Sequence, residues 1–198
     1  MRAPVRTAVL LTMTLAAPAL IPGCSAGRSG SPYATPSEAD RDSLKAQRLT
    51  QEAAAILDTN PDKAERLLRD ALTADLYHGP AHNNLGVIYL NRGMLYEAAS
   101  EFEWARKLLP NLPDPRMNLA LTLEKAGRTD EALATYASAL EVYPGHIPTL
   151  QAMTRLQVRA GKTDAATAAA LEELALKGET PEWRAWAQAV RTRLASPR

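Results

Sequence analysis

Residues 79–112 read GPAHNNLGVIYLNRGMLYEAASEFEWARKLLPNL, and the spacing of residues in this stretch recurs along the chain. A step of 34 residues carries Gly93 to Gly127 and then to Gly161. The same step pairs small residues with small ones, an aromatic with an aromatic, and proline with proline. The pairs are Gly86 and Ala120, Ala98 and Ala132, Phe102 and Tyr136, Ala105 and Ala139, and Pro110 and Pro144. Several independent positions that keep one period indicate an internal repeat.

Each repeat is expected to form two helices joined by a tight turn. In the quoted stretch the helices are predicted at residues 81–91 and 96–109, on either side of Gly93. Glycine adopts the left-handed conformation that ends many helices, and the proline after the second helix prevents that helix from continuing. Because Gly86 and Ala98 are small, the two helices can approach each other closely. One such pair cannot bury its apolar side alone, so stacked pairs are expected to share a core.

This repeat resembles the tetratricopeptide repeat, whose pattern is W-x₂-L-G-x₂-Y…A-x₃-F…P. The expected repeats span residues 45–78, 79–112, 113–146 and 147–178. The two central repeats carry nearly all of the pattern, with His82 and Arg116 in place of tryptophan. Their matching positions are Leu85, Gly86, Tyr89, Gly93, Ala98, Phe102, Ala105, Pro110, Leu119, Ala120, Gly127, Ala132, Tyr136, Ala139 and Pro144. The outer repeats are more degenerate, although the last one keeps Gly161 and Ala166. The resemblance implies an all-α fold, an α-solenoid of about four helix-turn-helix repeats.

The C-terminal segment, residues 179–198, is expected to form a helix that covers the last repeat. Thr180 can cap such a helix and Pro181 suits its first turn. Apolar residues then follow at helical spacing, at Trp183, Trp186, Ala187, Val190 and Leu194. The favoured interpretation of the two tryptophans is that they belong to the core, and the alternative is that they form an exposed docking patch.

The N-terminal residues 1–23 have the pattern of a secretory signal peptide. Two arginines precede an apolar stretch at residues 7–21, which is shorter than the ~20 residues that a membrane-spanning helix needs. The stretch ends in Ile-Pro-Gly-Cys, which resembles the lipobox of bacterial lipoproteins and implies that Cys24, the single cysteine, is lipidated. The alternative is an ordinary secretory signal in which Cys24 is incidental. Residues 24–44 are rich in Ser, Gly, Pro and Ala, and this composition favours a flexible linker.

The composition argues against several classes of function. The 23 basic and 22 acidic residues leave a net charge of +1, whereas a nucleic-acid-binding module needs a basic surface. One cysteine and three histidines offer little material for a metal site, and His78 and His82 are separated by a Gly-Pro turn. The motifs of common nucleophilic and nucleotide-binding sites are absent from the sequence. We therefore expect a non-enzymatic protein without a cofactor, a metal or a nucleic-acid partner.

The resemblance also implies a binding groove, because in this family the first helix of each pair lines the inner surface. Carried over position by position, the groove begins with the apolar residues Leu49, Ala53, Ile56 and Leu57. It continues through Asn83, Asn84, Val87, Leu90, Asn91, Met117, Asn118, Leu121, Glu124, Lys125, Gln151, Arg155, Val158 and Arg159. Asparagine side chains can bind a peptide backbone, and Arg155 and Arg159 suit a carboxylate. The alternative for Asn84 and Asn118 is a packing role.

Taken together, these features predict a protein-protein interaction scaffold that a lipid anchors to the bacterial cell envelope. By resemblance, related lipoproteins assist the assembly of pili, secretion systems or other envelope complexes. Ser25, which follows the lipidated cysteine, implies delivery to the outer membrane, facing the periplasm. The alternative function is a regulatory adaptor of a periplasmic peptidase or a cell-wall hydrolase.

Overall fold

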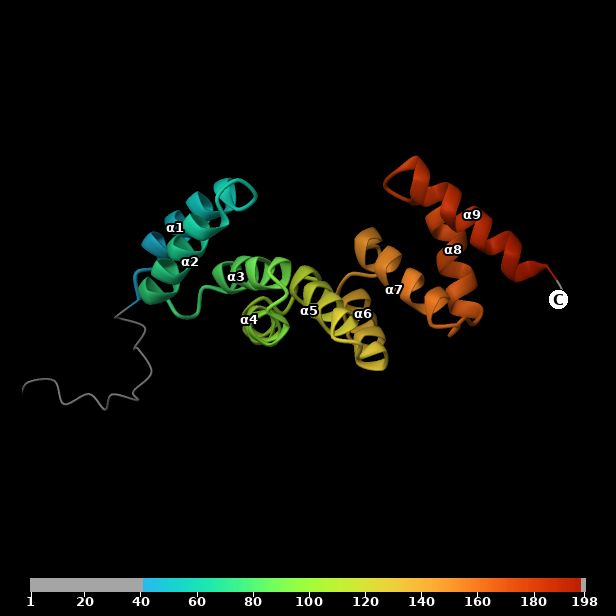
Figure 1. Ribbon diagram of the computed structural model, residues 1–198, viewed down its shortest axis with the longest axis horizontal. Coiled ribbons are helices and arrows are strands. Elements are labelled where there is room, and N and C mark those ends of the chain that lie inside the picture. Colours follow the sequence, from blue (N-terminus) through green and yellow to red (C-terminus); the bar gives the residue numbers. More distant parts are fainter. Residues whose placement is uncertain (1–40, 197–198) are drawn as a thin grey trace, which may run out of the picture. The chain divides into compact units, whose positions relative to one another are not determined.

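The computed structural model describes residues 41–196, and these residues form nine α-helices and no strand (Figure 1). The helices are α1 (Ser43–Ile56), α2 (Pro61–Ala74), α3 (Gly79–Asn91), α4 (Leu95–Leu108), α5 (Asp114–Lys125), α6 (Thr129–Val142), α7 (Ile147–Arg159), α8 (Ala165–Lys177) and α9 (Pro181–Ala195). The predicted signal peptide, Cys24 and most of the predicted linker lie outside the described residues. Helix α1 starts inside the last two residues of that linker, where the Asp42 carboxylate accepts a hydrogen bond from the Lys45 backbone N–H at 2.9 Å. Within residues 41–196, every helix is too short or too polar to cross a membrane.

The helices pack as a series of pairs. Helices α1 and α2, α3 and α4, and α5 and α6 make the most extensive contacts, and each pair then contacts the next one through α2 and α3, α4 and α5, and α6 and α7. The first helices of successive pairs, α1, α3, α5 and α7, also contact one another in turn. This is the arrangement that the repeat predicts, an α-solenoid of helix-turn-helix units.

Three glycines form equivalent bends between the helices of a pair. Gly93, Gly127 and Gly161 have φ values of 75°, 77° and 67°, in the left-handed region that glycine adopts without strain. In each bend the N–H of the residue after the glycine donates a hydrogen bond of 2.9 Å to a carbonyl of the preceding helix. These bonds run from Met94 to Tyr89, from Arg128 to Leu123 and from Lys162 to Gln157. These bonds satisfy carbonyls that a helix end leaves unpaired. The prediction from the three spaced glycines is confirmed.

The main core repeats with the same period. Leu68, Phe102 and Tyr136 occupy equivalent positions on the second helices, and all three are fully buried. Small residues flank them on both sides, and these are also fully buried, at Ala64, Ala98, Ala132, Ala71, Ala105 and Ala139. Large and small side chains therefore alternate along the second helices, as the sequence predicts.

The fourth pair departs from the period. Ala166, which the repeat aligns with Ala98 and Ala132, is exposed, and its neighbour Thr167 is fully buried instead. The cause is a later start of helix α8. The Asp164 carboxylate accepts from the Thr167 N–H at 2.8 Å, while the Asp164 N–H donates to the Thr167 hydroxyl at 3.2 Å. This capping box fixes the helix start and shifts the buried position by one residue.

The C-terminal helix α9 packs against α8, as predicted. Leu171, Leu174, Ala187 and Val190 form a second buried cluster between these two helices. The Thr180 hydroxyl accepts from the Trp183 N–H at 3.4 Å, which confirms the predicted cap. Leu194, expected on the same apolar stripe, is 47% exposed because it lies in the last turn of the helix, beyond the cluster.

Candidate functional site

The residues expected to line a groove lie on or next to the first helices α1, α3, α5 and α7, and we call the surface that α3, α5 and α7 share the first-helix face. Leu49, Ile56 and Leu57, on and next to α1, are half-buried and pack on the main core. Asn91, Lys125, Arg155 and Arg159 are exposed on the first-helix face. Asn83, Asn84, Val87, Met117, Asn118 and Leu121 are half-buried, and the three apolar members of this group pack on the main core. The face therefore offers polar and charged groups on an apolar floor.

Three of the expected groove residues are buried, and the first of them is Ala53 of α1, which is fully buried in the main core. Leu90 is 5% exposed and belongs to the main core, because α3 is contacted by α1, α2, α4 and α5 and has little surface left. Gln151 is 4% exposed, and within the described part of the chain its Nε2 atom has no hydrogen-bond partner. None of these three side chains is available to a partner, so the prediction is wrong for these three positions.

A chain of amides connects α3 to α5 on the first-helix face. Asn118 Nδ2 donates to Asn83 Oδ1 at 3.1 Å, and Asn83 Nδ2 donates to Asn84 Oδ1 at 3.5 Å. Each amide carries two donor hydrogens and an oxygen with two lone pairs, so these bonds use only part of its capacity. The bond from Asn118 to Asn83 therefore holds α5 and α3 together, as the packing alternative expects for Asn118, and the remaining donors and acceptors suit a peptide backbone.

The basic end of the face is organised around one carboxylate. The Glu124 side chain is 6% exposed, and its Oε1 atom lies 3.0 Å from Arg159 Nη2 and 3.6 Å from Arg155 Nη2. The Tyr136 hydroxyl donates to Glu124 Oε2 at 3.1 Å. Burial, and then the Glu124 charge, raise the pKa of Tyr136 far above its ordinary value of 10.0, so this hydroxyl stays protonated and remains a donor. Two guanidinium groups share one carboxylate, and the cluster keeps a net positive charge.

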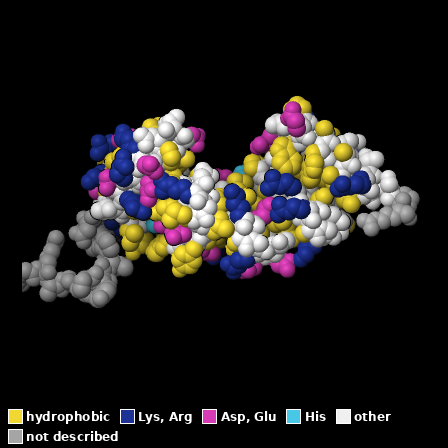
Figure 2. Space-filling view, in the orientation of Figure 1, with side chains coloured by type: hydrophobic (Ala, Val, Ile, Leu, Met, Phe, Trp, Pro, Cys, Tyr) yellow, Lys and Arg dark blue, Asp and Glu magenta, His cyan; other side chains and the backbone are white. Residues whose placement is uncertain are grey.

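A cavity adjoins this cluster. It has a volume of about 290 Å³ and is lined by Arg155, Thr180, Glu182, Trp183 and Trp186. Both tryptophans are half-buried, and only Trp186 packs against the C-terminal cluster, so their interpretation as core residues is only partly right. In Figure 2, dark blue basic side chains lie over α7, next to a yellow hydrophobic patch that extends toward the start of α9.

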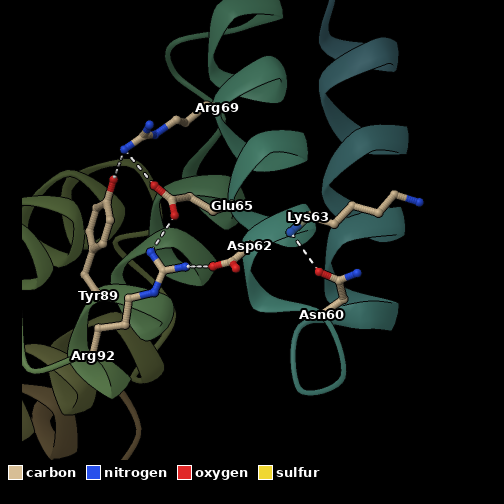
Figure 3. Close-up of polar contacts among 7 residues, drawn as sticks. All are labelled: Asn60, Asp62, Lys63, Glu65, Arg69, Tyr89 and Arg92. Atoms are coloured by element: carbon tan, nitrogen blue, oxygen red, sulfur yellow. Dashed lines mark hydrogen bonds and ion pairs between the residues drawn. The ribbon is translucent and has the colours of Figure 1, made fainter.

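An ion network that the repeat pattern does not predict holds α3 against α2 (Figure 3). Arg92, at the end of α3, donates to Glu65 and Asp62, and Arg69 donates to the Tyr89 hydroxyl at 3.0 Å. Glu65 also pairs with Arg69 at 2.6 Å and thereby connects the two arginines. These contacts fix the first helix of one repeat to the second helix of the preceding repeat. They therefore position the amides of α3.

His82 takes the place of the tryptophan in the repeat pattern. It is 3% exposed and stacks on Trp104, with ring centroids 5.6 Å apart and planes inclined by 13°. Its ring nitrogens lie 2.6 Å from Glu101 Oε2 and 2.8 Å from the Leu76 carbonyl oxygen. The histidine is therefore a packed, hydrogen-bonded residue. Among residues 41–196, no three His, Cys, Asp or Glu side chains are grouped closely enough to bind a metal ion.

Comparisons with known proteins agree with this fold. Residues 114–146 match the family model of the tetratricopeptide repeat. Tetratricopeptide repeat protein 8 of Mus musculus is 28% identical over 105 residues, which are 53% of this chain and 20% of the mouse protein. The human protein of the same name is also 28% identical over 105 residues, 19% of its length. The chain thus spans about a fifth of the length of the curated relatives it matches.

Solved structures share the arrangement of helices at low sequence identity. The first tetratricopeptide domain of Spaghetti (RPAP3), bound to the HSP90 peptide SRMEEVD, has a TM-score of 0.58 at 18% identity, covering 62% of this chain and 98% of that one. MamA has a TM-score of 0.57 at 17% identity, covering 77% and 83% of the two chains. The O-GlcNAc transferase of Thermobaculum terrenum has a TM-score of 0.61 at 20% identity, covering 66% and 26%. The fold is therefore that of a tetratricopeptide-repeat solenoid, and the family match covers residues 114–146.

Proposed function

We propose that this chain is a non-enzymatic scaffold that binds another protein on its first-helix face while a lipid on Cys24 anchors it to the bacterial envelope. The observation that carries the proposal is the adjacency, on consecutive first helices, of the linked Asn83 and Asn118 amides and the two arginines that share Glu124. Scaffolds bind in this way, with polar groups that position a peptide backbone and charged groups that fix its direction.

The charge of the site favours an acidic partner segment. Arg155 and Arg159 have side chains that are 45% and 60% exposed, so a carboxylate from solution can reach both of them. Charge-assisted hydrogen bonds of this kind are the stronger ones at an interface. Two structures with the same fold support this choice. The first RPAP3 domain binds the HSP90 peptide SRMEEVD and the second domain of human RPAP3 binds the HSP70 peptide SGPTIEEVD, and both peptides carry adjacent glutamates near an aspartate.

The envelope role rests on the sequence of the N-terminal residues. The lipobox-like Ile-Pro-Gly-Cys supports a lipid at Cys24, and two or more acyl chains give stable attachment to a membrane. We place the protein on the outer membrane, facing the periplasm, where it assists the assembly of an envelope complex such as a pilus or a secretion system. A regulatory adaptor of a periplasmic peptidase or cell-wall hydrolase would use the same face for a different partner.

Site-specific photo-crosslinking in cells tests the binding face. The photoreactive amino acid benzoylphenylalanine is placed at Lys125, which is exposed on the first-helix face, or at Glu141, which is exposed on the second helix of the same repeat. We expect a defined crosslinked partner from position 125 and none from position 141. Mass spectrometry of the product then separates an assembly complex from a peptidase or hydrolase. Equal crosslinking from both positions would contradict the proposed face.

Fatty-acid labelling tests the anchor separately. Cells that are fed an alkyne-bearing palmitate analogue should label the wild-type protein, and Cys24→Ser should remove the label and release the protein from the membrane fraction. Ser25→Ala, which changes the next residue and keeps the cysteine, is the matched control and should be labelled normally. A Cys24→Ser protein that is still labelled would refute lipidation at this residue.

A further inference from the structure

The packing of α7 and the start of α9 leaves a cavity between them, and its size and lining indicate what it can bind. Its volume of about 290 Å³ is at the small end of the range for ligand sites, so it suits one large side chain better than a whole cofactor. Trp183 and Trp186 form an edge-to-face pair in its wall, with ring centroids 5.3 Å apart and planes at 85°. The pair offers an indole face and an indole edge side by side, and aromatic side chains pack well on both.

The charges around the cavity indicate what lies beside that side chain in the partner. Arg155 belongs both to the cavity wall and to the Glu124 cluster, where Arg159 lies nearer to the carboxylate. Glu182, also in the wall, is exposed, and the Thr180 hydroxyl lowers the pKa of its carboxyl below the ordinary value of 4.5. In the Glu124 cluster, Arg155 and Arg159 carry two positive charges against one carboxylate, and the remaining positive charge complements an anion.

We propose that this cavity is the anchor site for an aromatic side chain of the partner, and that Arg155 and Arg159 bind a carboxylate next to that aromatic residue. The inference rests on the proposed function, because the arginines belong to both sites. Tryptophan and arginine are the residues most enriched where interfaces gain their energy, and such residues gather around pockets that exclude water. The partner segment is accordingly acidic and aromatic, and its aromatic residue inserts between α7 and α9.

A peptide library tests this choice of occupant directly. Random 12-residue peptides displayed on phage are selected on the purified full chain, and the same selection is made on Trp183→Leu and on Trp104→Phe. Trp183→Leu keeps an apolar side chain but removes the indole, whereas Trp104 lies outside the cavity and serves as the matched control. We expect the wild type and Trp104→Phe to enrich peptides with an aromatic residue beside Asp or Glu, and Trp183→Leu to lose this enrichment.

A second measurement does not depend on how Trp183→Leu folds. The Trp104→Phe chain retains Trp183 and Trp186 as its two tryptophans, so its fluorescence reports on the cavity. A selected peptide should shift this emission on binding, and replacing the peptide's aromatic residue by alanine should weaken binding roughly tenfold or more. Binding without a change in emission would overturn the anchor site.

The remaining outcomes separate this inference from the proposed function. If the selected peptides are acidic but lack an aromatic residue, and bind Trp183→Leu as well as the wild type, the cavity is not an anchor. The binding face would survive in that case, provided that Arg155→Gln still weakens those peptides. Enrichment of basic peptides would show that the indoles hold a cation and would overturn the inference. A selection that enriches no peptide on the wild type would overturn both.

Discussion

The phenyl ring of Phe102 fills the space that a side chain at Gly86 would need. A Cβ atom built on Gly86 would lie 2.6 Å from Phe102 Cε1 and 2.8 Å from Cδ1, and real Cβ atoms do not approach other carbon atoms this closely. In the next repeat the equivalent residues are Ala120 and Tyr136, both fully buried. The two repeats therefore solve the same packing problem with different pairs of small and large side chains.

We predict that Gly86→Ala destabilises the fold, although alanine favours a helix over glycine by about 1 kcal/mol. Overpacking a filled core costs about 1–3 kcal/mol, so the two effects oppose each other and the clash with Phe102 decides the sign. The measurement is a double-mutant cycle in urea with Phe102→Leu, which removes the ring. The double variant should lose less stability than the sum of the single changes, by about 0.5 kcal/mol or more. Additive losses would show that the ring is not what excludes a side chain at position 86.

Substitutions of the glycines in the bends should also destabilise the fold, but for a different reason. A Cβ atom on Gly93 meets no atom within 4 Å, so its φ of 75° alone makes it intolerant of other residues. We expect Gly93→Ala to cost about 1–2 kcal/mol and Gly93→Asn to cost less, because asparagine visits the left-handed region more readily. Thermal unfolding of both variants checks this order. Equal losses for alanine and asparagine would argue against backbone strain as the cause.

Replacing either of two buried threonines of α7 by valine should change the stability of the protein, in opposite directions at the two positions. Thr154 is 1% exposed, and within the described residues its hydroxyl has no hydrogen-bond partner, so Thr154→Val should stabilise the protein by about 1 kcal/mol. Thr149 is also buried, but its hydroxyl lies 2.7 Å from His146 Nδ1, so Thr149→Val should destabilise it by about 1 kcal/mol. Denaturant midpoints of the two variants provide the comparison. A stabilised Thr149→Val would contradict the hydrogen bond to His146.

The cap of α8 should make stability depend on pH in acid. Hydrogen bonds from the Thr167 backbone N–H and hydroxyl lower the pKa of Asp164 below its ordinary value of 3.8. As the pH falls, Asp164 is therefore protonated in the unfolded chain before it is protonated in the folded one. The contribution of the Asp164 charge to the stability of the fold is present above pH 3.8 and is lost as the pH falls through the lower pKa of the folded state. Asp164→Asn keeps a capping oxygen without a charge. We expect it to be less stable than the wild type at neutral pH and equally stable in strong acid, as measured by urea unfolding at each pH.

Much of the fold could be predicted because it depends on local chemistry that repeats. A glycine that must adopt positive φ, such as Gly127, is visible in the sequence as a residue type at a fixed spacing. The same holds for the buried Phe102 and Tyr136. The fourth pair could be predicted less accurately. The capping box at Asp164 starts helix α8 later than the 34-residue period requires, so Thr167 is buried in place of Ala166.

The candidate site could be predicted only in outline. The resemblance predicts which helix of each pair lines the groove, and of the residues that it indicates, Arg155 and Arg159 are exposed, while Asn83 and Asn118 are half-buried. It could not show that Glu124 binds both arginines, because Glu124 belongs to one repeat and the arginines to the next, and the repeat pattern does not indicate which side chains of neighbouring repeats meet. The cavity beside Trp183 depends on how α9 packs, and α9 lies beyond the repeats.

The central claim, that the first-helix face binds an acidic partner, is best tested by altering its charge without disturbing its packing. Removing the arginines alone would leave Glu124 buried and unpaired, which is costly, so the test combines Arg155→Gln and Arg159→Gln with Glu124→Gln. Glu124→Gln alone keeps both arginines and removes the carboxylate that they share. Arg128→Gln is the matched control, because Arg128 pairs with Glu131 away from this cluster.

The deciding measurement is the yield of the partner crosslinked from position 125 in cells that carry each of these variants. We predict a higher yield for Glu124→Gln, an unchanged yield for Arg128→Gln, and a yield lower by roughly tenfold or more for the triple variant. A triple variant that is folded, by circular dichroism, and still captures the partner as well as the wild type would contradict the claim.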